Sequence, residues 1–258
     1  MIPAYMNDTC LGLVVTKKII PQFKALVRSL LYHNPWFNLP IMVVCVDLSE
    51  DDLDEISYVY LNLSLIIPNQ NFYSNILDDI SLPKYRQYEK YKYELIKQFP
   101  YKKIIILNTN TIILGSLKKL FMFRAAFGAV RKYVKEKDCY IDSIDSSIWV
   151  FTKNKFKSGA LEELERKFLK SSNLEKSLME TFNVRWLPQG YGVDRYVLQS
   201  KKYKIRVLKN KIMYNTNPIF ILNLFGLIDE PTIAIREEKQ RVFLDFWRRF
   251  SDDPSGKS

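Results

Sequence analysis

Residues 101–115, YKKIIILNTNTIILG, decide the fold that the sequence predicts. The consecutive apolar residues Ile104–Leu107 are typical of a strand buried on both faces, as found inside a parallel sheet. This strand stops abruptly at the polar residues Asn108, Thr109 and Asn110. In open α/β sheets, ligands bind just beyond the carboxyl ends of the strands. We therefore expect this triplet to lie at a binding site.

The chain before this stretch alternates between apolar strands and amphipathic helices. Strands are expected at 11–15, 41–46 and 65–67, with a helix from Pro21 and a second helix capped by Ser49 and Asp52 between them. Such a β-α-β-α-β opening predicts a parallel sheet with right-handed crossovers. Later helices are expected at 83–99, 159–169, 174–182 and 238–250, and later strands at 125–130, 144–151, 205–208 and 232–235.

Length and composition favour one compact body. At 258 residues with 47% apolar content, we expect a single domain over 1–250, with a nucleotide-binding half at about 8–125 and an acceptor half at about 126–250. Residues 251–258 are predicted to form a disordered tail.

Charge and cysteine content limit the classes of partner and site. A net charge of +11 favours anionic partners such as nucleotide phosphates, nucleic acid or a membrane surface. Cys10, Cys45 and Cys139 are far apart and are expected to be buried thiols in a reducing compartment. The single histidine, His33, leaves zinc sites and histidine-based triads without their usual groups. With no signal peptide and no apolar run near the ~18 residues that span a bilayer, the expected location is cytoplasmic.

The order of the segments resembles that of the glycogenin-like glycosyltransferases, of the family eight type, which have the GT-A fold. In that family a lysine-bearing helix precedes a buried strand that ends in Asp-x-Asp, and a second apolar run and a Leu-x-x-Leu-Phe turn follow. The same order occurs here at Lys92, Ile104–Leu107, Asn108–Asn110, Ile112–Leu114 and Leu117–Phe121. The resemblance implies an α/β fold with a Rossmann-like, mostly parallel central sheet flanked by helices and a smaller acceptor-side sheet. It also implies transfer of a sugar from a nucleotide-sugar donor to an acceptor hydroxyl, with retention of the anomeric configuration.

The resemblance also assigns individual residues to roles. Thr16 falls in the nucleotide-base loop, Lys92 where the family contacts phosphate, and Asp145 and Ser146 in a strand that faces the donor sugar. Asp194 matches an aspartate close to the reacting centre, and Arg195 replaces the glutamine that follows it. Each assignment has a plainer alternative. Lys92 can be a solvated helix lysine, Asp145 can cap its own turn, and Asp194 can be a carboxylate favoured by a helix dipole.

The departures from the family concern metal binding. Both aspartates of Asp-x-Asp are asparagines here, and the histidine that the family supplies near Arg236 is missing. Amide oxygens can ligate Mn²⁺ or Mg²⁺ but add no charge, whereas Lys92 and Arg236 can neutralise a diphosphate directly. The sequence therefore favours a metal-independent or metal-weak site, with no cofactor besides the nucleotide-sugar substrate. Taken alone, Asn108–Asn110 also reads as a simple turn, and the same triplet recurs at 215–217.

Three functions stay open at this point. The first is a glycosyltransferase whose acceptor is a glycan or a protein. The second is a transferase that glycosylates modified bases of nucleic acid, which the positive charge allows. The third is a catalytically inactive descendant that binds a nucleotide, a glycan or a partner. The predicted helix 238–250 either docks on the core of the protein or contacts a membrane surface or partner.

Overall fold

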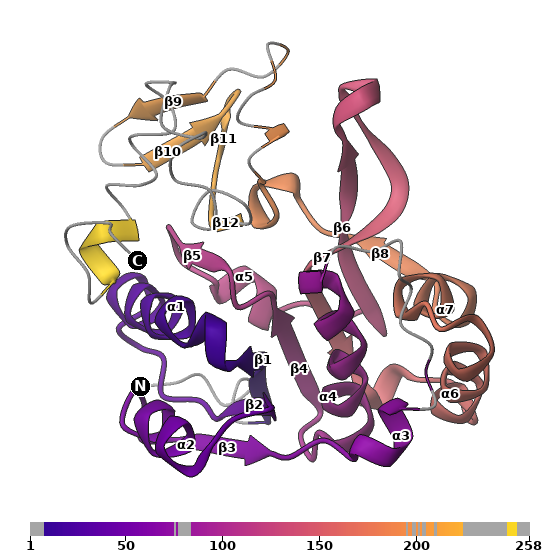
Figure 1. Ribbon diagram of the computed structural model, residues 1–258. Helices are drawn as coiled ribbons and strands as arrows, with labels where there is room; N and C mark the ends of the chain where they lie inside the picture. The colour runs from indigo at the N-terminus through magenta and orange to yellow at the C-terminus, as the bar shows by residue number, and fades with distance from the viewer. Residues whose placement is uncertain are drawn as a thin grey trace.

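The computed structural model describes residues 8–74, 76, 84–194, 196–197, 200, 202, 205–208, 211–223 and 247–251. A seven-stranded sheet of order β3-β2-β1-β4-β7-β6-β8 lies at its centre (Figure 1). Four neighbouring strands run parallel: β1 (Thr9–Thr16), β2 (Ile41–Val46), β3 (Leu63–Ile66) and β4 (Lys103–Leu107). β1, β2 and β4 are buried along their whole length, as their apolar runs predict.

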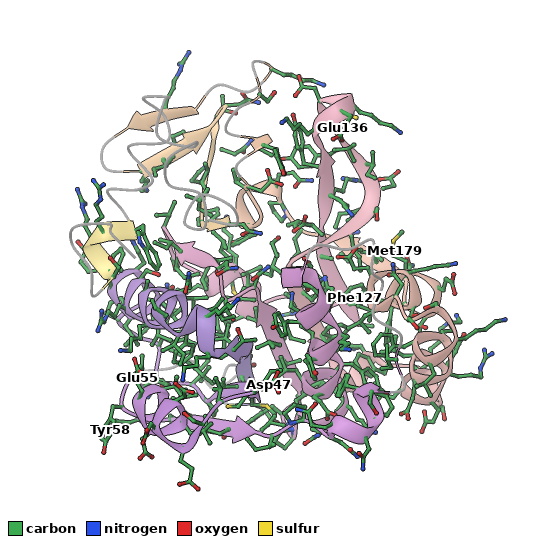
Figure 2. All side chains as sticks on the ribbon, viewed as in Figure 1. Asp47, Glu55, Tyr58, Phe127, Glu136 and Met179 are labelled. Atoms are coloured by element: carbon green, nitrogen blue, oxygen red, sulfur yellow. The ribbon has the colours of Figure 1, made fainter. Side chains whose placement is uncertain are left out.

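The other half of the sheet contains the antiparallel strand. β7 (Cys139–Thr152) is antiparallel to both β4 and β6 (Phe127–Val134), and β8 (Val184–Trp186) is parallel to β6. β6 and β7 form a hairpin that extends beyond the sheet (Figure 1). Figure 2 shows Phe127 among the side chains of the body and Glu136 at the far tip of this hairpin.

Helices cover both faces of the sheet. α1 (Ile20–His33) and α2 (Glu50–Ser57) pack with alternate residues of β1 and β2 in one core. α4 (Lys92–Gln98), α6 (Ala160–Ser171) and α7 (Leu174–Thr181) pack on the opposite face in a second core. The fold is therefore a three-layer α/β sandwich, in which the alternating side chains of each central strand supply both cores.

Short elements complete the described chain. β5 (Thr111–Ile113) pairs antiparallel with β12 (Ile221–Asn223), and β9 (Ile205–Leu208), β10 (Lys211–Tyr214) and β11 (Asn217–Pro218) form a separate small sheet. α3 (Gln70–Ser74) and α5 (Lys118–Phe121) are short helices. None of the described helices is long and apolar enough to cross a membrane.

Most of the expected elements are confirmed, including the β9 strand and the Ser49–Asp52 capping box that begins α2. Three boundaries were wrong. α2, expected to reach about Tyr60, ends at Ser57. The segment Lys84–Tyr91, expected to be part of one long helix, is a 3₁₀ helix that precedes α4. β7, expected to begin at 144, begins at Cys139. Cys139 is consequently half-buried, whereas Cys10 and Cys45 are buried as predicted. The expected strand 232–235 lies outside the described residues.

Of the predicted helix 238–250, only its last four residues fall within the described part, and they are helical. Trp247 and Phe250 are buried there with Ala25 of α1, and Arg28 Nη1 donates to Phe250 O at 3.1 Å. This end of the helix therefore docks on the core of the protein.

Candidate active site

The carboxyl end of β4 is held against both neighbouring strands. The backbone N–H of Asn108 donates to Ser147 O of β7 at 2.9 Å, and the buried Thr109 hydroxyl donates to Val14 O of β1 at 2.6 Å. Asn108 Oδ1 accepts a hydrogen bond from the backbone N–H of Asn110 at 3.2 Å. The triplet is thus a side-chain-capped turn, and it also lies at the strand edge where α/β proteins bind ligands.

A bulge in β7 faces this turn. Arg131 of β6 pairs with Ile144 and Ala129 pairs with Trp149, so the residues between them on β7 leave the regular ladder. Asp145 Oδ1 accepts from the Ser147 N–H at 2.8 Å, and Asp145 O accepts from the indole N–H of Trp149 at 2.9 Å. Asp145 therefore caps a turn as the plainer alternative predicts, but it lies inside β7 and not at its start. Bulges of this kind often redirect side chains beside active sites.

Lys92 is buried, with 3% of its surface exposed. Its ammonium lies 2.6 Å from Ser146 O, 2.6 Å from Glu89 Oε2 and 4.8 Å from the centre of the Trp149 ring. The alternative that Lys92 is a solvated lysine on the helix surface is therefore wrong. The side chain reaches the bulge of β7 beside the candidate site, and it already has an internal counter-charge.

The glycine-containing loop that leads to Asp194 packs against the same bulge through Gly192. A Cβ atom on Gly192 would lie 2.8 Å from Ser147 Oγ and 2.5 Å from Val130 Cγ2, so only glycine fits this approach. Two residues further on, Asp194 Oδ1 accepts from the Val197 N–H at 3.0 Å, as a capping carboxylate does.

The structure thus brings together most of the residues predicted for the site. Thr16 is the buried last residue of β1, next to β4 in the sheet. Thr16 lies at the same end of the sheet as the turn Asn108–Asn110, the bulge Asp145–Ser147 and the loop that leads to Asp194. Arg195 and Arg236 lie outside the described residues.

Three further polar groups in this region are not evident from the sequence. Ser147 Oγ, Gln189 Oε1 and Tyr191 Oη are buried and have no hydrogen-bond partner within the described part of the chain. The Tyr191 ring stacks on Phe220 at 4.8 Å, and burial raises the pKa of Tyr191 to about 12. Unpaired buried polar atoms are rare, and they often mark a place where water or a ligand binds. The signal in the sequence is the pair of glycines that flank Tyr191.

The turn Asn108–Asn110 offers a divalent cation only neutral oxygen ligands. Across the residues that the structure describes, no three His, Cys, Asp or Glu side chains gather to hold a metal ion. Asn108 Oδ1 is already engaged by the Asn110 N–H, and a neutral amide contributes no charge to such a site.

Comparison with known proteins identifies the fold. Neither the known family models nor the curated proteins contain a match to this chain. Among solved structures, galactosyltransferase LgtC, in complex with donor and acceptor sugar analogs, matches with a TM-score of 0.68 at 9% identity, over 95% of this chain and 98% of that one. The glycosyltransferase GlyE of Streptococcus pneumoniae matches with 0.60 at 14% identity, over 92% and 59% of the two chains. Mouse xyloside xylosyltransferase 1 matches with 0.55 at 11% identity, over 84% and 97%. The likeness confirms the predicted GT-A fold.

Proposed function

We propose that this protein is a glycosyltransferase that moves a sugar from a nucleotide-sugar donor to an acceptor hydroxyl, with retention of the anomeric configuration and without a divalent cation. The observation that carries the proposal is the position of Asn108–Asn110 in a GT-A fold. The turn lies at the carboxyl end of β4, hydrogen-bonded to β1 and to the bulge of β7. Open α/β sheets bind their ligands at this edge.

In this proposal, cationic side chains neutralise the diphosphate of the donor as it departs. Lys92 supplies one ammonium, of which Glu89 and Ser146 O engage two of the three N–H donors. Arg195 and Arg236 are the guanidinium groups proposed to bind phosphate oxygens, because guanidinium groups pair well with phosphate. Direct neutralisation by such groups stabilises a departing anion in the way that a metal ion otherwise does.

Two carboxylates act on the sugar. Asp145 accepts hydrogen bonds from sugar hydroxyls, and Asp194 stabilises the positive charge that develops on the sugar as its bond to the diphosphate breaks. Both carboxylates accept a backbone N–H, at 2.8 Å for Asp145 and 3.0 Å for Asp194. These bonds fix the orientation of each group before a donor arrives.

One observation favours a second candidate, a protein that binds a nucleotide or glycan without turnover. Lys92 already has Glu89 as its counter-charge and Ser146 O as a hydrogen-bond acceptor. A lysine whose charge is already balanced stabilises a departing diphosphate less, which favours binding without turnover.

A thermal-shift panel of UDP-, GDP-, CDP- and dTDP-sugars in EDTA, followed by an assay for donor hydrolysis, tests the proposal. We expect one donor to raise the Tm without metal, because a ligand present at about 100 times its Kd stabilises the fold by about 2.7 kcal/mol. We also expect this donor to be hydrolysed. Asp194→Asn should lose turnover and keep donor binding. A donor that binds without turnover favours the second candidate. A requirement for Mn²⁺ would overturn the metal-free site, and failure of every donor with and without Mn²⁺ would overturn the proposed function.

A further inference from the structure

A pocket opens at the end of the central sheet opposite to the turn Asn108–Asn110. It has a volume of about 450 Å³ and is lined by Thr9, Lys103 and Thr152, together with Phe121–Arg124 and Lys155. Thr9 and Lys103 begin β1 and β4, whereas Thr152 ends the antiparallel β7. The pocket is therefore separated by the length of the strands from Asn108–Asn110.

The lining of the pocket carries more positive charges than there are described carboxylates to pair with them. Lys102, Lys103, Arg124 and Lys155 face a single carboxylate, Asp8, which pairs with Lys102 at 2.7 Å. Within the described residues, no carboxylate forms an ion pair with Lys103, Arg124 or Lys155. The pocket thus has a surplus of cations that an anionic ligand can neutralise.

Lys103 is the informative member of this group because it is 9% exposed. Its ammonium donates to Phe121 O at 2.5 Å, and its burial, followed by the charge of Arg124, lowers the pKa of Lys103 to about 8. Among the described residues this buried ammonium has only a carbonyl as its partner, which is unfavourable without a counter-charge. A bound anion would supply that charge.

The pocket is also preformed, and its lining includes the hydroxyl of Thr152. Thr152 is 8% exposed, and its Oγ1 has no hydrogen-bond partner in the part of the chain that the structure describes. Backbone hydrogen bonds hold the walls together, from Lys103 N to Asp8 O at 3.1 Å and from Thr152 N to Ala126 O at 2.9 Å. A ligand therefore meets walls that are already ordered.

We propose that this pocket binds a small organic phosphate. The phosphate group lies against Lys103 and Arg124 and accepts a hydrogen bond from the Thr152 hydroxyl, and the organic part packs on the apolar wall Phe121–Phe123. A doubly charged phosphate suits a guanidinium beside an ammonium better than a single carboxylate does. The volume exceeds what inorganic phosphate fills and falls within the range of about 300 to 1,000 Å³ typical of small-molecule sites.

Calorimetry with phenyl phosphate, inorganic phosphate and phenol on the full chain tests this site. We expect phenyl phosphate to bind with a stoichiometry of one and more tightly than inorganic phosphate, and phenol not to bind. Arg124→Gln should weaken phenyl phosphate about tenfold or more, and Thr152→Val several-fold, because each removes a donor to the phosphate. Asn110→Ala, at the other edge of the sheet, should leave the affinity unchanged.

Lys119→Gln is the matched control, since Lys119 is exposed on α5 close to the pocket but does not line it. It removes the same charge as Arg124→Gln and should change the affinity less than twofold. Equal weakening by the two variants would show non-specific attraction to a basic surface and would overturn the proposal. No saturable binding of phenyl phosphate to the wild-type chain would overturn it as well. Both results leave the proposed transfer reaction untouched, because that reaction is tested at the opposite edge.

Discussion

Replacing Lys92 by methionine separates the structural role of this lysine from its proposed role in donor binding. The change keeps an apolar stem against Trp149 and removes an ammonium that is 2.6 Å from Glu89 Oε2 and 2.6 Å from Ser146 O. Breaking a buried ion pair by removing one partner costs about 3 to 5 kcal/mol. The Glu89 side chain is 17% exposed, so water partly solvates the orphaned carboxylate. We therefore expect a loss of about 2 to 3 kcal/mol.

The companion variant is Lys92→Met combined with Glu89→Gln. It removes the orphaned carboxylate and should recover about 1 to 2 kcal/mol of the free energy of unfolding, as the coupling between two contacting residues predicts. Thermal unfolding measures both effects, because about 1 kcal/mol corresponds to about 2 to 4 °C in a chain of this size. Thermal shift with the donor found in the sugar panel then measures binding.

The two roles predict different outcomes for the double variant. If Lys92 neutralises the diphosphate, the double variant regains stability but does not bind the donor. If Lys92 only balances Glu89, it regains both. A loss below about 0.5 kcal/mol in the single variant would refute the buried ion pair itself.

Three other changes have effects that the structure predicts. Lys103→Met should raise the free energy of unfolding at pH 7 by about 1 to 2 kcal/mol after allowance for partial solvation, because burial and Arg124 lower the pKa of Lys103 from 10.5 to about 8. The protonated lysine destabilises the fold fully below pH 8. The advantage of the variant should therefore fall between pH 8 and pH 10.5, so denaturation should show a much smaller advantage at pH 10 than at pH 7. Gly192→Ala should cost about 1 to 3 kcal/mol in thermal unfolding, since its Cβ would lie 2.5 Å from Val130 Cγ2; an unchanged Tm would contradict the tight packing. Ser49→Ala should cost about 1 kcal/mol through loss of the capping box of α2, and the exposed Ser57→Ala at the other end of the helix serves as the control that should cost less.

The central strands could be predicted because both of their faces are buried, so that their sequences are continuous runs of apolar residues. The amino-terminal part of β7 could not be predicted in this way, because one of its faces is solvated. Residues Ile148–Thr152 lie between β4 and β6, whereas Cys139–Ile144 pair with β6 alone and are mostly half-exposed. A strand with one neighbour and a solvated face keeps polar residues, which a search for apolar runs does not detect.

The positions of the candidate site residues could be predicted from the ends of buried strands, but the residues that they contact could not. Asn108–Asn110 ends a buried strand, so its place at the edge of the sheet could be predicted. The bond from Lys92 to Ser146 O joins residues 54 positions apart, and no local pattern encodes it. The phosphate pocket likewise combines the amino ends of β1 and β4 with the carboxyl end of β7. Only the topology of the mixed sheet brings these three strand ends together.

The pairing of Lys92 changes which residues the proposed reaction depends on. Lys92 and Glu89 together carry no net charge. Asp145 in the bulge and Asp194, two residues beyond Gly192, add negative charge. A departing diphosphate therefore meets no surplus of positive charge from these four side chains. The asparagines at 108 and 110 remove two further carboxylates relative to Asp-x-Asp, which lowers the repulsion of the diphosphate but supplies no attraction. If the reaction proceeds without a metal ion as proposed, the attraction has to come from cations other than Lys92. Arg195 and Arg236 are the two that the proposal names, so the proposed reaction depends on these arginines more than on Lys92.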